Sequence, residues 1–237
     1  MIFARNIIDT NNPVIQLDNK AITPCNCVKF LGVYIDNKLK WDEHINNIKM
    51  KLNKSFYALN KVKHVLPRKQ MIALYYTLVY PHLVYGITLW GGTYDVHLNK
   101  IVVTHKKIVR ILVGAIYNAH TIPIFKKFNM LKIHDIYKLQ VAKYVLAFLH
   151  NKLPSALNNI FVISNTIHDH NTRHCTALNL NPFKSLTYFT RNNILKTGPE
   201  IWNKLSPELY LMNNNESLVS TQCFASRFRR TLLREYV

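Results

Sequence analysis

The clearest hydrophobic periodicity of the chain lies in residues 42–61, DEHINNIKMKLNKSFYALNK, and the predicted fold is derived outward from this segment. Apolar residues recur there at intervals of three and four, which places them within an arc of about 80° on a helix; they are Ile45, Ile48, Leu52, Phe56 and Leu59. Asp42 and Glu43 fall in the first turn, where negative charge favours the helix dipole. Lys51, Lys54 and Lys61 lie opposite the apolar arc. The stretch predicts an amphipathic helix with a cationic outer face.

Two more helices are predicted after it. Pro67 begins an uncharged one that runs toward Gly91-Gly92, since proline favours a first helical turn and glycine a helix end. The third covers 96–113, and its polar face carries three basic residues, Lys100, Lys107 and Arg110. His105 falls on its apolar side, where a hydrogen-bonded core histidine is expected. With short links, the three helices form an antiparallel bundle.

The flanking segments predict strands before the bundle and helices after it. Residues 14–22 read as strand, turn and strand around Asp18-Asn19. Residues 28–35 read as a further strand, in which Gly32 marks a bulge or a close backbone approach. Residues 134–150 are apolar nearly all round, which is typical of a buried helix. Near the end, Ile201-Trp202 opens a short amphipathic piece, and a basic helix runs from Phe224 to Leu233.

The predicted fold class is mainly α with a small N-terminal antiparallel β element (α+β). A β-rich part covers 1–40, the three-helix bundle covers 41–118, and a helical and irregular C-terminal region covers 119–237.

The net charge of the chain indicates which class of partner it binds. The chain has 237 residues with 31 Lys and Arg against 12 Asp and Glu, a formal net charge of +19. Such an excess favours a polyanion, nucleic acid first and an anionic membrane second. Residues 70–94 carry no charged side chain and are long enough to span a bilayer, but Pro81 and His82 are expensive in lipid. A buried core helix and no membrane partner are therefore predicted.

The sequence contains few of the residue clusters that form catalytic or metal-binding sites. Asp42-Glu43 is the one adjacent acidic pair, and no Asp-Asp occurs, whereas polymerase and nuclease centres gather carboxylates around divalent metal ions. No catalytic residue is predicted. His170, His174 and Cys175 with Cys25-x-Cys27 form an alternative zinc set, but the cysteine spacing is too tight. A polar loop that uses Arg173 for a phosphate or a buried carboxylate is favoured. No metal site is predicted.

The four cysteines are too sparse for a disulfide scaffold. Free thiols indicate a reducing compartment, so a cytoplasmic and nuclear location is expected.

Blocks in order along the chain resemble the end of the reverse transcriptase domain and the following region of non-LTR (LINE-type, jockey-like) retrotransposons. They are Phe30-Leu31-Gly32-Val33-Tyr34-Ile35-Asp36, Tyr80-Pro81, Tyr85-Gly86, Leu89-Trp90-Gly91, Pro123-Ile124-Phe125, Leu131-Lys132-Ile133-His134-Asp135, His170-Asn171-Thr172-Arg173, Gly198-Pro199-Glu200-Ile201-Trp202 and Phe224-Ala225-Ser226-Arg227-Phe228. The resemblance covers nearly the whole chain.

The resemblance implies that this chain is the end of the palm, the thumb and the C-terminal region of such a polymerase. Met1-Ile2-Phe3 resembles the strand after the catalytic hairpin, so the metal-binding aspartates would lie upstream. We therefore expect a fragment that is inactive on its own. It would need no cofactor, although the intact family enzyme uses magnesium.

By the same resemblance, the partners are RNA and DNA in a template–primer duplex, and the missing upstream part of the polymerase. Phe30, Leu31 and Gly32 would lie near the primer. Phosphate contacts are predicted for seven basic residues: Lys51, Lys54, Lys61, Lys100, Lys107, Arg110 and Arg173. The alternative is a host-retained helical interaction module without a role in polymerisation.

Overall fold

The computed structural model describes residues 16–21, 23, 25–164, 178–184, 193–212 and 215–236. In these ranges the chain is mainly helical with small antiparallel hairpins, which confirms the predicted class. The helices are α1 (Asp42–Val62), α2 (Arg68–Leu78), α3 (Tyr80–Val84), α4 (Ile87–Trp90), α5 (Asp95–Val113), α6 (Ile122–Lys127), α7 (Ile133–Leu149), α10 (Ile194–Trp202) and α11 (Thr221–Arg234), with 3-10 turns η1 (Ser155–Leu157) and η3 (Pro207–Leu209). The hairpins pair β1 (Gln16–Leu17) with β2 (Lys20–Ala21), β3 (Cys27–Phe30) with β4 (Val33–Asp36), and β5 (Leu211–Met212) with β6 (Asn215–Leu218).

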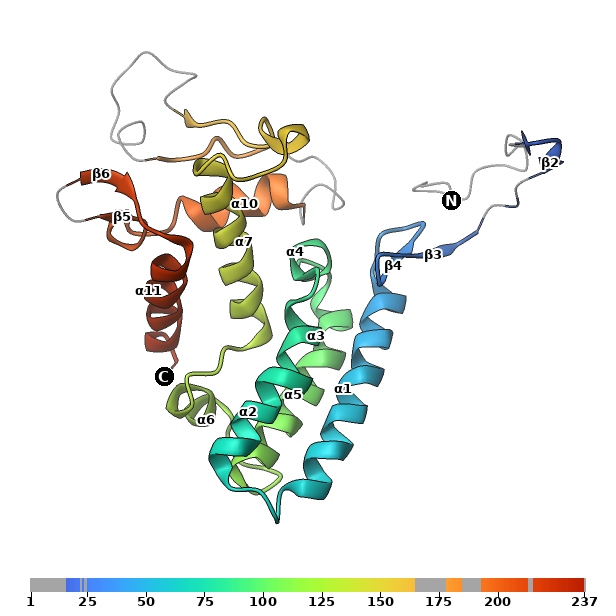
Figure 1. Cartoon of the computed structure of the whole chain (residues 1–237), viewed down its shortest axis with the longest axis vertical. Coiled ribbons are helices and arrows are strands. Elements are labelled where there is room, and N and C mark those ends of the chain that lie inside the picture. Colours follow the sequence, from blue (N-terminus) through green and yellow to red (C-terminus); the bar gives the residue numbers. More distant parts are fainter. Residues whose placement is uncertain are drawn as a thin grey trace.

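Helices α1 and α5 pack side by side and run in the same direction, and α2 to α4, which connect them, run the opposite way (Figure 1). The predicted apolar face of α1 is buried, with Ile45, Leu52 and Leu59 inaccessible to solvent. On α5, the Nε2 atom of buried His105 lies 2.8 Å from the Tyr75 hydroxyl of α2. The bundle and its hydrogen-bonded core histidine are therefore present as predicted.

The prediction of one continuous helix from Pro67 to Gly91 is wrong. Three helices occupy the segment, because Pro81 has no N–H to donate and therefore ends the α2 hydrogen-bond ladder. Gly86, with φ of 60°, then separates α3 from α4. In the ranges that the structure describes, no helix combines the length and the apolar character needed to cross a bilayer.

The prediction of a single strand with a glycine bulge over 28–35 is also wrong. Strands β3 and β4 pair as a hairpin, and Leu31-Gly32 forms its two-residue turn. Both turn residues have positive φ, 45° and 81°, the geometry that matches the twist of two antiparallel strands. Gly32 thus serves a turn. The predicted turn at Asp18-Asn19 joins β1 to β2 and is confirmed.

Helix α7 lies at the centre of the second half of the chain. It is buried on most sides, as predicted, and packs against α3 and α4 as well as α10 and α11 (Figure 1). At Gly91, a Cβ would lie 2.6 Å from the Tyr137 ring of α7, so the bundle approaches α7 closely at a glycine. The hydrophobic core is continuous from α1 to α11. The domain boundaries at 40/41 and 118/119 stay predictions.

The prediction that a short helix begins at Ile201-Trp202 is also wrong. Trp202 ends helix α10, whereas Ile201-Trp202 was expected to open one. The start is at Asn193, whose side chain accepts a hydrogen bond from the Leu195 N–H. The buried Trp202 ring packs against Tyr210 and Phe224, with ring centroids 4.7 and 5.8 Å away. This aromatic cluster secures α11, the predicted basic helix, to the core.

Candidate nucleic-acid interface

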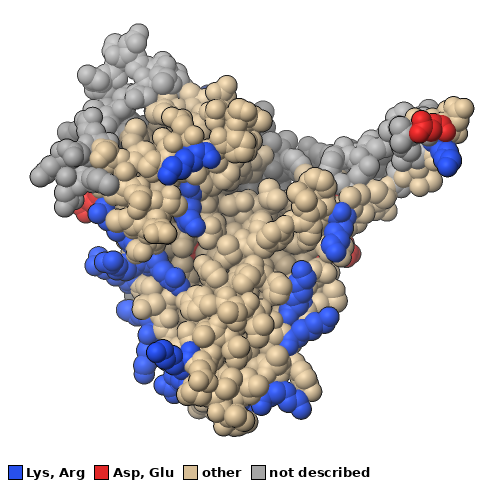
Figure 2. All heavy atoms as spheres, viewed as in Figure 1, with Lys and Arg blue, Asp and Glu red and all other residues tan. Residues whose placement is uncertain are grey.

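Basic side chains are spread over two regions of the visible face. Figure 2 shows lysine and arginine over α1 on one side and over α6 and α11 on the other, with few acidic atoms between them. The two regions differ in how their cations are held, and α1 carries three of the seven predicted phosphate contacts, Lys51, Lys54 and Lys61.

The outer face of α1 presents Lys51, Lys54 and Lys61 to solvent. From Lys51 to Lys61 the helix rises about 15 Å, a length over which duplex DNA carries about nine phosphate charges. The exposed Tyr57 ring lies between these lysines in sequence, and the Lys61 Nζ atom is 5.3 Å from its centroid. No carboxylate occurs in α1 beyond its first turn. The face is therefore an acid-free cationic surface with one aromatic ring.

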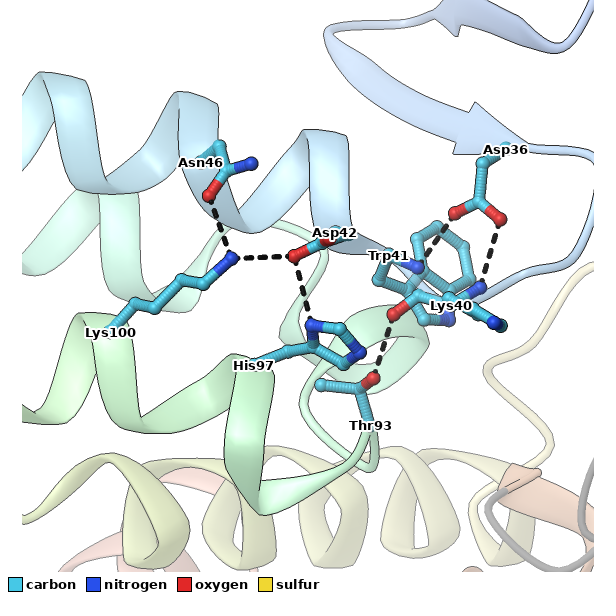
Figure 3. Close-up of polar contacts among 8 residues, drawn as sticks. All are labelled: Asp36, Lys40, Trp41, Asp42, Asn46, Thr93, His97 and Lys100. Atoms are coloured by element: carbon cyan, nitrogen blue, oxygen red, sulfur yellow. Dashed lines mark hydrogen bonds and ion pairs between the residues drawn. The ribbon is translucent and has the colours of Figure 1, made fainter.

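Two acidic residues near this surface, Asp36 and Asp42, make hydrogen bonds within the fold (Figure 3). Trp41 precedes α1 and makes no side-chain cap, and Asp36 of β4 instead holds the loop that leads from the hairpin into α1. Its carboxylate accepts hydrogen bonds from the backbone N–H groups of Lys38, Lys40 and Trp41, at 3.0, 3.0 and 2.7 Å. Thr93 adds a second link, because its hydroxyl donates to the Lys40 carbonyl at 2.9 Å. The hairpin is thereby joined to the start of the bundle.

Asp42 ties α1 to α5. One carboxylate oxygen lies 2.7 Å from Lys100 Nζ and 2.8 Å from His97 Nδ1, and Lys100 also donates to the Asn46 side chain at 3.1 Å (Figure 3). The hydrogen bond from Lys100 is the main reason that the pKa of Asp42 is lowered. Lys100 was predicted to contact phosphate, and the structure pairs its charge with Asp42 instead of leaving it to solvent.

The other two predicted phosphate contacts of α5 are half-buried. Lys107 and Arg110 lie on the side of α5 away from the core, and the Arg110 Nε donates to the Ala119 carbonyl at 2.9 Å. Arg110 thus holds the loop that follows α5. Lys106 is more exposed than either.

The tip of the β3–β4 hairpin is apolar and exposed. Phe30 and Leu31 are 61% and 75% accessible, and the Tyr85 hydroxyl donates a hydrogen bond to the Leu31 carbonyl. A Cβ at Gly32 would meet the Tyr85 ring at 3.6 Å. Leu31 adopts the left-handed conformation, which costs a non-glycine residue about 1 kcal/mol. Tyr85 supports this strained tip, so the exposed Phe30 and Leu31 are held in place.

Some residues named from the sequence fall in parts of the chain that the structure does not describe. Arg173 and the candidate zinc ligands His170, His174 and Cys175 lie outside the described residues. Cys25 is exposed and Cys27 half-buried, both as free thiols. Among the residues described, no three His, Cys, Asp or Glu side chains gather in a way that could hold a metal ion.

Sequence reasoning missed Tyr57, Tyr85 and Lys106 as surface residues. The helical position of Tyr57 could have shown it, because it lies between Lys54 and Lys61 on the polar side of α1. Tyr85 could not be found this way, since its partner Leu31 is 54 residues away in the sequence.

Three curated proteins align with the chain. A probable RNA-directed DNA polymerase from transposon X-element of Drosophila melanogaster is 23% identical over 151 residues, 62% of this chain. RNA-directed DNA polymerases from mobile element jockey are 26% identical, over 56% of this chain for Drosophila melanogaster and 62% for Drosophila funebris. The chain is similar to non-LTR retrotransposon RNA-directed DNA polymerases. The resemblance predicted from the sequence blocks is confirmed.

The chain aligns with only a small part of each of these polymerases. The aligned part of the chain spans 15–17% of each relative. No family model matches the chain, and no solved structure matches it significantly.

Proposed function

We propose that this chain binds the template–primer duplex of a reverse transcriptase through the outer face of α1. The observation that carries the proposal is the row of exposed lysines, Lys51, Lys54 and Lys61, on a helix face without carboxylates. Lysine side chains are flexible point charges, and they suit phosphates whose positions vary along a sequence-independent duplex. The names of the polymerase relatives support RNA and DNA as the ligands.

The hairpin tip supplies a second contact in this proposal. Phe30 and Leu31 are exposed apolar residues of the β3–β4 hairpin, which lies at the N-terminal end of α1, where Asp36 holds the loop before the helix (Figure 1). An apolar tip can pack on a sugar or a base edge, while lysines neutralise phosphates. We propose that the tip contacts the primer and α1 the duplex behind it.

We further propose that binding, and not polymerisation, is what this chain contributes. Three of its aspartates are committed to structural hydrogen bonds: Asp36 to backbone N–H groups, Asp42 to Lys100 and His97, and Asp135 to the Tyr236 hydroxyl. The catalytic aspartates would then come from sequence upstream of this chain. Metal-dependent nucleotide incorporation by the purified chain would overturn this part.

The test is fluorescence anisotropy with a labelled RNA–DNA hybrid duplex over a salt series. Wild type should lose affinity steeply between about 50 and 200 mM salt, because each neutralised phosphate adds about −0.9 to the slope of log K against log salt. Changing Lys51, Lys54 and Lys61 to Gln together should make the slope shallower by about one unit per lysine, evenly across duplex sequences. Lys204→Gln is the matched control, an exposed lysine just beyond α10.

A flat salt dependence, or equal losses in the triple variant and in Lys204→Gln, would contradict duplex binding by α1. The absence of measurable duplex affinity, together with tight binding of an acidic protein, would favour the alternative of a helical interaction module.

A further inference from the structure

A small pocket lies where three helix ends meet, and none of the residues that line it belongs to the Lys51–Lys61 row. Its volume is about 230 Å³, and six residues line it: Arg68, Val113, Pro123, Ile124, Lys127 and Phe128. They come from the start of α2, the end of α5, and α6 with the residue after it. A pocket of this size is smaller than the sites of drug-sized ligands, and it suits a single planar group.

Local sequence explains why the three ends converge. Pro67 precedes α2, Gly114 ends α5 with φ of 66°, and Pro123 lies in the first turn of α6. Arg68 bridges two of the ends, since its Nη2 lies 3.4 Å from the carbonyl of Val113 in the last turn of α5. The pocket is thus built on the ends of helices that the core holds in position.

One aromatic ring and two cations give the pocket its chemistry. The Arg68 guanidinium carbon is 5.9 Å from the centroid of the half-buried Phe128 ring, and the Lys127 Nζ is 6.0 Å from it. Both distances lie within the range of cation–π contacts. Val113 and Ile124 add apolar walls, and no acidic residue lines the pocket. An aromatic ring with two cations close to it matches the chemistry of a nucleobase and its phosphate.

The surroundings extend this chemistry along the surface. Lys126 and Lys127 of α6 and Arg230 and Arg234 of α11 are exposed, and Figure 2 shows the basic side chains of this region. A single strand that leaves the pocket would continue over positive charge. A paired base cannot enter a pocket, because it is stacked inside its duplex, whereas an unpaired base is free to stack on an aromatic side chain.

We propose that this pocket binds one unpaired nucleotide of a single-stranded nucleic acid. The base stacks on Phe128, and its phosphate lies between Arg68 and Lys127. The site shares no residue with the Lys51–Lys61 row and does not depend on duplex binding there.

Anisotropy of labelled oligo-U and oligo-dT with the whole chain tests the proposal. Phe128→Leu keeps an apolar side chain but loses the stacking face, and it should weaken single-strand binding about tenfold, the loss typical of one stacked base. Phe128→Trp should retain binding, because it restores an aromatic face. Phe183→Leu is the matched control at an exposed phenylalanine, and it should change affinity less than twofold.

The cations are tested in the same way. Arg68→Gln should weaken binding and lower the salt slope by about one unit, whereas the adjacent exposed Lys69→Gln should do less because Lys69 does not line the pocket. The triple lysine variant of α1 should leave oligo-U affinity within twofold of wild type.

Unchanged oligo-U affinity in both Phe128→Leu and Arg68→Gln would overturn the proposal. An equal loss for blunt hybrid duplex would overturn the single-strand assignment, and so would tighter binding of a poly-glutamate peptide than of oligo-U. Should Phe128→Leu unfold, as judged by its thermal melt, Phe128→Trp and Arg68→Gln decide.

Discussion

Helices α1 and α11 are both amphipathic and both basic, but their cations are placed differently. On α1, Lys51, Lys54 and Lys61 extend into solvent. On α11, Arg229 donates to the Tyr76 hydroxyl at 2.9 Å and to the Asn129 carbonyl at 2.7 Å, and Arg227 donates to the carbonyls of Glu208 and Leu211.

The difference between arginine and lysine fits the acceptors that each side chain meets. An arginine guanidinium presents several donors in a planar fork, so one side chain can hold two fixed acceptors. A lysine ammonium on a flexible stem is better suited to acceptors that arrive from outside. A high positive charge in the sequence therefore combines two kinds of cation, those that join elements of the fold and those that are left for a ligand.

The largest effect is expected at the end of α11. The Tyr236 hydroxyl donates to the buried Asp135 carboxylate at 2.6 Å and accepts from the Lys132 N–H at 2.8 Å. Tyr236→Phe removes both bonds and should lower the free energy of unfolding by about 3 kcal/mol, because a buried charge loses a partner. Urea denaturation measures the loss. A change as small as that of Tyr57→Phe, at an exposed tyrosine, would show that α11 is not fixed by this contact.

A substitution of Arg229 tests whether the hydrogen-bonded arginines of α11 stabilise the fold. Arg229→Ala should cost about 2 kcal/mol of folding stability, since hydrogen bonds made by a charged group are worth about 1.5–3 kcal/mol. The exposed neighbour Arg230 is the control, and Arg230→Ala should shift the urea midpoint little. Equal midpoints for the two variants would remove the distinction between structural and free arginines.

Acid should weaken the bundle through its buried histidine. Burial lowers the pKa of His105 to about 3, so the folded chain keeps this imidazole neutral while the unfolded chain binds a proton below its ordinary pKa of 6.5. Its contribution to stability is complete above pH 6.5 and is lost as pH falls, by about 1.4 kcal/mol per pH unit between about pH 6 and pH 4. His105→Phe should flatten the curve of unfolding free energy against pH by that slope. His120→Phe, at an exposed histidine, should keep the wild-type slope.

The smallest effect on stability is expected for the α1 lysines. Replacing Lys51, Lys54 and Lys61 by Gln should change the free energy of unfolding by less than about 0.5 kcal/mol, as is usual for exposed positions. Urea denaturation of the triple variant beside Arg229→Ala measures both sides of the comparison. A loss as large as that of Arg229→Ala would mean that the α1 lysines are structural, and the duplex proposal would lose its main support.

The sequence by itself determined the helices α1, α5, α7 and α11 and the likeness to retrotransposon polymerases. Helical periodicity is a local property, so residues three and four apart reveal a buried face without knowledge of the partner. The same locality identified Lys51, Lys54 and Lys61 as one outward face. Local periodicity gave wrong predictions where a single residue ends a helix or forms a turn, as at Pro81, Gly86 and Gly32. Each of these residues lies in a run that otherwise continues the expected pattern.

Only the tertiary structure decided which cations are available to a ligand. Lys100 looked equivalent to Lys54 in sequence, but folding brings it to Asp42, 58 residues away. Arg229 meets Tyr76 across 153 residues, and the pocket at Phe128 forms only when the ends of α2, α5 and α6 meet. Contacts at such separations depend on how helices pack, which the periodicity of one helix does not encode.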